Sequence, residues 1–441
     1  MNNLIWFRND LRIHDNTSLG SACKGDKVMA LYCFESKYFR GGDFGFNRTG
    51  KYRARFLIQT VSRLRENLAA LNIPLFIYSG EAEKVIPKLV VEQGISNIYL
   101  QKEWTRDERA TLAAVKKRVS AHVDFHESYD QFLFHPNDIP FPSFEQIPEI
   151  FTPFRKNCEK FGRVRPLLNI PNSLPVHNMI ENTTTIPDLG KLGLEEFQMD
   201  ERTAFPFIGG ENEGLERVRA YFWETKKLAN YKKTRNGLLG QDYSSKLSPW
   251  MANGSISPRK VYWEVKRFEK EVIKNQDTYW LIFELIWRDF FKYISLKHGN
   301  RIFKIGGIRD IEHPWKTSQE EKQRWVSGTT KEPFVNANMQ ELSRTGWMSN
   351  RGRQNVASYW SKQLGQDWRI GASYFESMLL DYDVHSNWGN WMYASGVGND
   401  PKDRTFSIKR QSLMYDSRGV FQNLWNTTEN GIGAQTELKF E

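Results

Sequence analysis

The sequence predicts an α/β domain followed by a mainly α-helical domain. Three observations support this division: residues 1–128 alternate short apolar runs with helical patterns, residues 129–205 are rich in proline and turn residues, and helical periodicity dominates residues 206–425. With 441 residues the chain is long enough for more than one hydrophobic core, because single cores rarely exceed about 250–300 residues. We therefore expect two domains joined by a linker at 129–205, and a tail at 426–441 without an assigned role.

The first domain has the pattern of a parallel sheet. Apolar runs of strand length cover residues 4–7, 28–34, 74–79, 97–101 and 122–128, and amphipathic segments between them cover 48–72, 81–94 and 106–119. This alternation predicts a Rossmann-like sheet with helices on both faces. Ligands of such sheets bind beyond the carboxyl ends of the strands. Neither GxGxxG nor GxxxxGK[ST] follows the first strand, so the usual dinucleotide and P-loop sites are not predicted.

The second domain combines helical periodicity with an unusual number of tryptophans. The predicted helices cover residues 209–235, 257–274, 277–299, 355–364 and 371–384. Thirteen of the 15 tryptophans follow residue 205. Such a region is either a large helical core or the housing of a flat cofactor or an electron-transfer path.

Composition limits the partners and the compartment. The net charge is +10, and residues 206–441 hold 35 Lys and Arg against 27 Asp and Glu. This excess favours a polyanionic partner, although ordinary solubilising charge is the alternative. Three scattered cysteines suit neither a disulfide framework nor a zinc site. No signal peptide and no apolar run of about 18 residues are found. We expect a cytoplasmic monomer without a membrane partner.

Two polar segments of the helical domain depart from what a helix bundle needs. YSSKLSPW at 243–250 offers N–H and O–H donors, either to phosphates or as a cap of the next helix. In ELIWRDF, Glu284, Trp287 and Arg288 recur at three- and four-residue spacing, so they share one helical face. Such a face lines a pocket or belongs to an amphipathic helix with an exposed salt bridge.

Two further segments concentrate charge. Asn350, Arg351 and Arg353 surround a flexible glycine, and Asp381 and Asp383 lie two residues apart. Two such carboxylates repel each other unless an arginine, a metal or the polar edge of a ligand pairs with them. A metal is disfavoured because no histidine–carboxylate set of the usual spacing accompanies them.

At this point long motifs become recognisable. FRNDLRIHDN at 7–16, YxxxRNxLLGxDYSSKLSPWMAxGSISPR at 231–259, TGWMSNRGRQNVAS at 345–358 and LDYDVHSNWGNWMYASGVGND at 380–400 resemble the photolyase/cryptochrome family. Two of these segments, MSNRGRQNVAS and DYDVxSNWGNW, resemble the cryptochrome-DASH branch of this family. The resemblance runs from residue 4 to about residue 412. It implies an N-terminal domain able to hold an antenna chromophore and a helical domain that binds FAD.

The resemblance also implies roles for individual residues. The implied FAD-binding residues are Tyr231, Ser244, Ser245, Leu247, Ser248, Arg288, Trp347, Asn350, Arg353, Phe375, Asp381, Asp383 and Asn387. The implied catalytic residues are Glu284, Trp287, Asn350 and Asn387. Asn387 faces flavin N5, Trp287 packs against the flipped bases, and Glu284 hydrogen-bonds them. In this interpretation Asp381 and Asp383 both lie near Arg353 and the polar edge of the flavin.

Three further expectations follow from the resemblance. Trp391, Trp368 and Trp315 match the tryptophan chain that photoreduces oxidised flavin, with core packing as the alternative. Glu103 matches a carboxylate that binds 5,10-methenyltetrahydrofolate as an antenna, with a helix-start glutamate as the alternative.

The lesion pocket departs from double-strand-active photolyases, because Gln354 and Tyr393 stand where those enzymes tend to have Met and Trp. A more polar pocket that stacks less favours single-stranded DNA, where flipping a dimer costs less.

The resemblance therefore implies a deoxyribodipyrimidine photo-lyase that repairs cyclobutane pyrimidine dimers with blue light. Photoexcited reduced FAD donates the electron, and dimer-bearing single-stranded DNA is the preferred substrate. Two alternatives stay open. One is a blue-light signalling flavoprotein, and the other is a DNA- or RNA-binding cryptochrome without a repair role.

Overall fold

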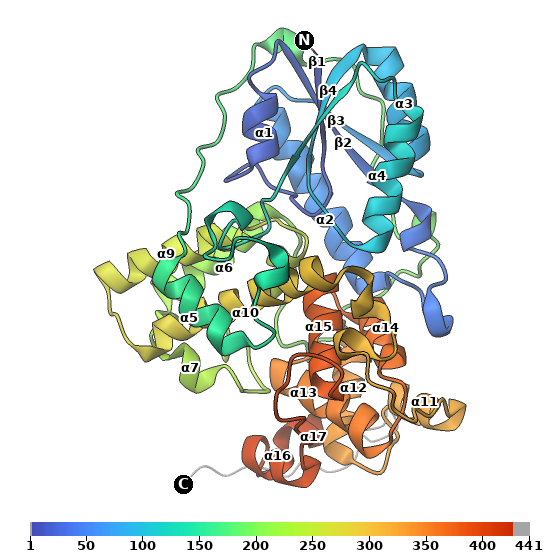
Figure 1. The fold of residues 1–441 in the computed structure, drawn as a ribbon, viewed down its shortest axis with the longest axis vertical. Helices are drawn as coiled ribbons and strands as arrows, with labels where there is room; N and C mark the ends of the chain where they lie inside the picture. The colour runs from blue at the N-terminus through green and yellow to red at the C-terminus, as the bar shows by residue number, and fades with distance from the viewer. Residues whose placement is uncertain (1, 427–441) are drawn as a thin grey trace.

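The structure is a computed structural model that describes residues 2–426, so the predicted tail lies almost wholly outside the described residues. Its N-terminal part contains a five-stranded sheet in the order β3-β2-β1-β4-β5, in which all neighbouring strands are parallel (Figure 1). The strands are β1 (Asn2–Trp6), β2 (Lys27–Phe34), β3 (Leu75–Ser79), β4 (Ile95–Gln101) and β5 (Asp124–Ser128). The predicted parallel α/β sheet is confirmed.

Helices cover both faces of this sheet, as predicted. On one face, α1 (Thr17–Ala22) and α2 (Lys51–Ala69) pack side chains such as Leu64 against Ile5. On the other face, α3 (Ala82–Gln93) and α4 (Arg106–Arg118) pack side chains such as Leu89 against Leu4. Because successive strand residues point to opposite faces, a strand buried on both sides reads as a continuous apolar run.

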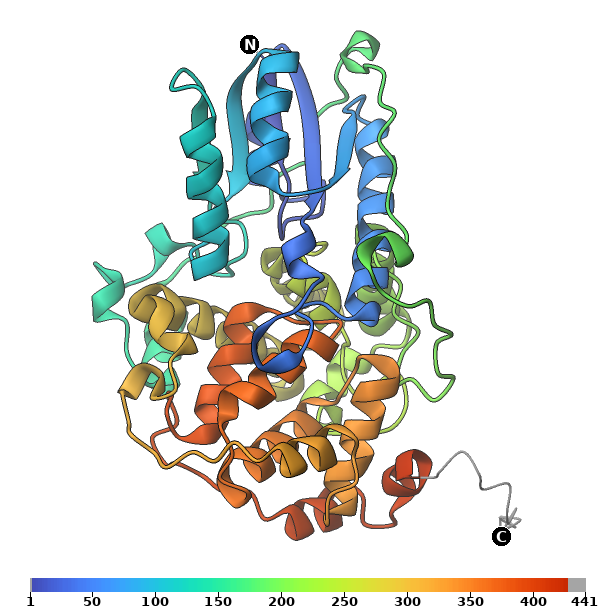
Figure 2. The same ribbon diagram turned by 90° about the vertical axis from the view of Figure 1, so that its right-hand side faces the viewer.

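The segment after β5 leaves the sheet, forms one helix and then returns along the α/β domain. Figure 2 shows its extended stretch running beside the strands and helices of that domain. Asn178 holds this stretch to β2, because its side chain accepts from Val28 N and donates to Val28 O, each at 2.9 Å. The helix, α5 (Phe151–Phe161), was not predicted. The proline-rich composition concealed it, although Pro153 lies in the first turn, where its missing N–H is not needed.

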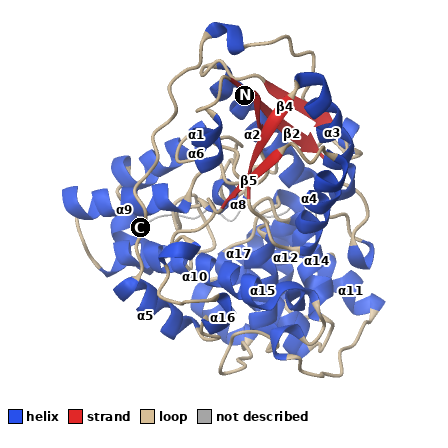
Figure 3. Ribbon diagram, turned by 45° about the horizontal axis from the view of Figure 1, so that its top comes forward, coloured by secondary structure: helices blue, strands red, loops and turns tan. Residues whose placement is uncertain are grey.

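The remaining part is mainly helical, and Figure 3 shows the strands confined to one side of the molecule. Its α-helices are α6 (Glu211–Val218), α7 (Tyr231–Thr234), α8 (Ser248–Ala252), α9 (Pro258–Glu271), α10 (Gln276–His298), α11 (Gln319–Val326), α12 (Pro333–Thr345), α13 (Asn350–Ser358), α14 (Trp368–Met378), α15 (Val384–Ser395), α16 (Ile408–Tyr415) and α17 (Val420–Asn426).

The long helix α10 is central to the helical domain, since it contacts α5, α7, α9 and α15. The predicted helix at 209–235 is interrupted by a π-helical turn at 219–224 and a 3₁₀ turn at 227–230. Among the helices of residues 2–426, none combines the length and apolar character needed to cross a bilayer.

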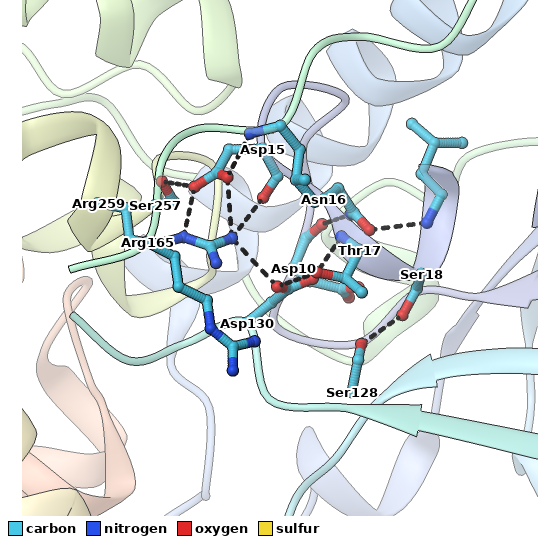
Figure 4. Close-up of polar contacts among 12 residues, drawn as sticks. Asp10, Asp15, Asn16, Thr17, Ser18, Ser128, Asp130, Arg165, Ser257 and Arg259 are labelled. Atoms are coloured by element: carbon cyan, nitrogen blue, oxygen red, sulfur yellow. Dashed lines mark hydrogen bonds and ion pairs between the residues drawn. The ribbon is translucent and has the colours of Figure 1, made fainter. Parts of the chain in front are cut away.

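A buried polar cluster joins the two domains (Figure 4). Arg259 of α9 lies 2.8 Å from Asp15 and 3.2 Å from Asp130, two carboxylates of the N-terminal domain. Ser257 donates to Asp15 at 2.6 Å, and Thr17 Oγ1 donates to Asp130 at 2.6 Å. Buried charges are tolerated when they are paired and hydrogen-bonded, so this cluster sets the position of α9 against the sheet.

Candidate functional site

The serine-rich turn between α7 and α8 contains a buried lysine, Lys246, between its serines. Arg217 of α6 donates to the carbonyls of Ser244 at 3.2 Å and Ser245 at 2.9 Å, which occupies the acceptors of the turn. Lys246 has a left-handed backbone with φ of 59°, and only 2% of the residue is exposed. Within the described residues its Nζ has no hydrogen-bond partner, and burial lowers the pKa of this amine well below its usual range. An anionic ligand would supply the acceptor that this buried Nζ lacks and would favour its protonated form.

Leu247, the last residue of this turn, is buried, and Ser248 begins α8. One further predicted ligand lies on α7, and another contacts this turn. Tyr231 is the buried first residue of α7, and Trp347 donates from Nε1 to Tyr243 Oη at 3.2 Å. The Lys246 Nζ lies 4.9 Å from the centre of the Trp347 ring. The structure thus brings most of the predicted phosphate and ribityl contacts to one place.

Asp381 is held by groups from two other segments. Arg353 Nη2 lies 2.9 Å from both of its carboxylate oxygens, and Ser248 Oγ donates to it at 2.7 Å. The Arg353 guanidinium is itself fixed by Nε, which donates to Met348 O at 2.9 Å. The pairing of Asp381 with an arginine, one of the expectations from sequence, is thereby found.

Asp383 departs from the expectation that it lies with Asp381 near Arg353. It contacts Lys292 of α10 at 2.9 Å, lies 3.8 Å from Arg288, and caps α15 by accepting from Ser386 N at 2.8 Å. Burial alone raises the pKa of Asp383, but the two cations outweigh it and hold that pKa well below the usual range. The two carboxylates have different partners, and Asp383 is itself the N-cap of α15.

Asn387 lies on the first turn and a half of α15 and is buried. Its Nδ2 donates to Ala372 O of α14 at 3.0 Å, which orients the carboxamide and leaves Oδ1 as the atom available to a ligand. Phe375, one turn after Ala372, is buried on the same helix. The predicted residues of α13 are less buried than those of α14 and α15. Asn350 is exposed at the start of α13, and Gln354 is partly buried one turn later.

Trp287 and Arg288, two residues of the predicted α10 face, make contacts with different parts of the molecule. Trp287 stacks on Phe151 of α5 with ring centres 3.7 Å apart and planes 10° from parallel. Its ring also neighbours Phe290, Phe291 and Tyr393, the last of them edge-on at 5.9 Å. Arg288 points elsewhere, because it donates to Gln131 O at 2.6 Å and Met251 O at 2.9 Å. Its guanidinium therefore joins the segment after β5 to α8 of the helical domain.

Glu284 lies one turn before Trp287 and is paired with a cation. Its Oε1 lies 2.8 Å from Arg235 Nη2, a residue just after α7. Burial raises the pKa of Glu284, and Arg235 opposes that rise. The carboxylate is thus oriented by a group that sequence analysis had not singled out.

The three predicted electron-transfer tryptophans follow one another across neighbouring elements. Trp391 of α15 meets Phe375 edge-on at 5.1 Å and lies against α14 where Gly371 leaves room, since a Cβ there would sit 2.1 Å from Trp391 Cη2. Trp368 begins α14 one turn before Gly371. Trp315 is joined to this point because Asp367 N donates to Lys316 O at 2.8 Å.

A cavity of about 210 Å³ lies between the two domains, beyond the carboxyl ends of β1, β2 and β4. Glu103 lines it and accepts from Gln101 Nε2 at 2.8 Å and from Asn9 Nδ2 at 3.4 Å. Burial raises the pKa of this carboxyl. Since α4 begins only at Arg106, Glu103 is not a helix-start residue, and the cavity interpretation gains support.

Several site residues were missed from sequence. Arg217, Arg235 and Phe151 lie on segments read only as helix or linker, and their contacts join residues far apart in the chain. Glu341 of α12 was also missed: 1% of the residue is exposed, and burial raises its pKa to about 8. A charged residue on the buried face of a helix was the available signal.

The sequence and the fold are similar to those of known proteins. A family model described as DNA photolyase matches residues 3–173, and one described as the FAD binding domain of DNA photolyase matches residues 280–433. A cryptochrome DASH of Gloeobacter violaceus is 46% identical over 425 residues, which cover 96% of this chain and 85% of the relative. One of Xenopus laevis is 44% identical over 424 residues, covering 95% and 81%.

Two solved structures share the fold over 96% of this chain. The cryptochrome of Synechocystis sp. PCC6803 superposes with a TM-score of 0.92 at 43% identity, covering 96% of this chain and 88% of that one. A bacterial class III photolyase from Agrobacterium tumefaciens superposes with a TM-score of 0.81 at 25% identity, covering 96% and 86%.

Proposed function

The chain belongs to the photolyase/cryptochrome family, in its cryptochrome DASH branch, and on this basis we propose that it repairs cyclobutane pyrimidine dimers with blue light, preferentially in single-stranded DNA. The observation that carries the proposal is the α10 face. There Glu284 lies one turn before a partly exposed Trp287, which meets Tyr393 of α15, the helix that also bears Asn387.

The residues present fit FAD. The buried Lys246 Nζ, which has no hydrogen-bond partner among the described residues, and the hydroxyls of Ser244 and Ser245 are donors that suit its phosphates. Arg353 and Asp381 offer a rigid donor and acceptor for its polar parts. When bound and reduced, FAD absorbs blue light and supplies the electron that opens the dimer.

Asn387 and Glu284 tune this chemistry. The Asn387 Oδ1 accepts from an N–H, so it favours the protonated N5 of a fully reduced flavin over an unprotonated one. Glu284, oriented by Arg235, hydrogen-bonds the flipped bases and stabilises the negative charge that develops on them. Its raised pKa favours a carboxyl that can donate such a bond.

DNA binding is supported by cations beside the α10 face. Lys232 and Lys233 on α7 are exposed, and Arg235 follows them. Phosphate contacts by such residues position a strand without reading its sequence.

The preference for single strands follows from stacking. One face of Trp287 is occupied by Phe151, and Gln354 and Tyr393 stack less on a base than Met and Trp do. Flipping a dimer out of a duplex costs a few kcal/mol, and this pocket offers less to offset that cost.

For the cavity between the domains we propose an antenna, 5,10-methenyltetrahydrofolate. Glu103 supplies a buried carboxylate acceptor for the N–H groups of a pterin ring, held in place by Gln101 and Asn9. The position beyond the strand ends is where such sheets bind ligands.

Illumination of the reduced protein with dimer-bearing oligonucleotides, single- and double-stranded at the same salt concentration, tests the repair proposal. We expect dimers to disappear in the light and not in the dark, and faster in single strands. Absence of light-dependent repair on both substrates would refute it.

A further inference from the structure

The predicted tryptophan chain touches the cavity between the domains through a fourth tryptophan. Trp388 of α15 meets Trp368 edge-on, with ring centres 5.7 Å apart and planes at 79°. The Trp388 ring also lines the cavity and is 3% exposed. Aromatic rings in contact are suited to pass an electron, so a route leaves Trp368 in a direction different from Trp315.

This route ends on a tyrosine. Trp388 Nε1 donates to Tyr382 Oη at 3.2 Å. The Tyr382 oxygen acts as acceptor in that bond, which leaves its own O–H free to donate elsewhere. Glu376 of α14 is the carboxylate that acts on this hydroxyl, because both residues line the same cavity and Tyr382 is among the groups that lower the pKa of Glu376.

Two arginines define the charge around this pair. Arg48 Nε lies 3.4 Å from Glu376 Oε1, and the Arg53 guanidinium lies 4.5 Å from the centre of the Tyr382 ring. A cation over the ring disfavours a positively charged tyrosine radical. Oxidation of Tyr382 therefore requires loss of its phenolic proton, for which Glu376 is the neighbouring acceptor. Burial raises the pKa of Glu376, which makes it a better base than an exposed glutamate.

We infer that Trp388, Tyr382 and Glu376 form a second donor branch for flavin photoreduction, with Tyr382 as the final electron donor and Glu376 as the proton acceptor. The inference rests on the proposed flavin site and tryptophan chain. One electron passes from Tyr382 through Trp388 and Trp368 to Trp391, which has lost an electron to the excited flavin. The phenolic proton moves to Glu376, which leaves a neutral tyrosyl radical and a neutral carboxyl group.

Spectroscopy of the intact, FAD-loaded protein tests this branch. After a blue flash on the oxidised protein, we expect a tyrosyl radical in electron paramagnetic resonance, with a signal that narrows when the chain carries ring-deuterated tyrosine. Tyr382→Phe and Trp388→Phe should abolish the signal. Glu376→Gln and solvent D₂O should each slow its formation several-fold, because the proton has lost its acceptor or has become heavier.

Tyr374→Phe is the matched control. Tyr374 is a buried tyrosine of α14 that meets Trp325 edge-on at 5.6 Å, and Trp325 in turn lies 6.0 Å from Trp391. It therefore neighbours the chain outside the inferred branch, and its variant should keep the signal. A radical that persists in Tyr382→Phe, or that disappears only in Tyr374→Phe, would overturn the inference. So would the absence of any tyrosyl signal in the unmodified protein.

Failure of the branch is distinguishable from failure of the proposed function. If Trp391→Phe suppresses photoreduction while Tyr382→Phe changes nothing, the branch is wrong and the flavin site stands. If the chain binds no FAD, the branch and the proposed function are both wrong. If Trp391→Phe leaves photoreduction unchanged, the branch and the predicted tryptophan chain are wrong, and the proposed repair by reduced FAD stands.

Discussion

Replacing Trp287 by alanine tests how the site recognises a flipped dimer. In the structure one face of the indole is covered by Phe151 at 3.7 Å, so a single face remains for a base. The expected loss is therefore one base–aromatic stack, about 1–3 kcal/mol. At about 1.4 kcal/mol per tenfold change, this corresponds to roughly 5- to 150-fold weaker binding of a dimer.

Phe151→Leu is the informative companion of this variant. It leaves the indole in place but removes the ring that holds it, an aromatic pair worth about 0.5–1.5 kcal/mol. We expect this variant to weaken dimer binding less than Trp287→Ala does. An equal or larger effect would mean that α5 itself contacts the DNA.

The assay is competition between dimer-bearing and undamaged thymine oligonucleotides, read by fluorescence anisotropy at one salt concentration. Salt must be fixed because phosphate contacts weaken steeply as it rises. Trp287→Ala should reduce the preference for the dimer and leave binding of undamaged DNA nearly unchanged. If both affinities fall by the same factor, Trp287 does not stack on the lesion.

Four further predictions concern photochemistry and stability. Trp391→Phe should severely slow photoreduction of oxidised flavin but spare repair by chemically reduced protein, as followed by flavin absorbance. Glu284→Gln should lower the repair yield per photon with DNA binding retained, because its role is charge stabilisation; lost binding would contradict this. Arg259→Met should lower the free energy of unfolding in urea by about 3–5 kcal/mol, because it removes the cation that pairs with two buried carboxylates. Burial raises the pKa of Asp289 to about 7, so the folded state binds more protons than the unfolded state. The unfolding free energy should fall between about pH 4 and 7 by up to about 1.4 kcal/mol per pH unit, and less in Asp289→Asn.

Local sequence determined the secondary structure well where it is periodic. The strands of the sheet were predicted because each is a short apolar run between helical patterns, and this signal needs no distant partner. The helix at 209–235 was predicted as continuous because its apolar spacing does not reveal the left-handed backbone of Lys226, where the helical path breaks. The α5 helix was not predicted, because the prolines around it indicated a linker more strongly than its short apolar face indicated a helix.

In the candidate site, too, sequence and tertiary structure determined different properties. The amino-acid sequence by itself determined which residues are chemically unusual, among them Glu284, Asp381 and Asn387, because polar groups inside helical patterns conflict with a simple core. Only the tertiary structure decided their partners, for example that Asp383 meets Lys292 rather than Arg353. It also decided that Phe151, far away in the chain, covers one face of Trp287. The physical reason is that periodicity reports only which side of an element is buried, whereas the direction of a hydrogen bond or a ring contact depends on how distant elements pack.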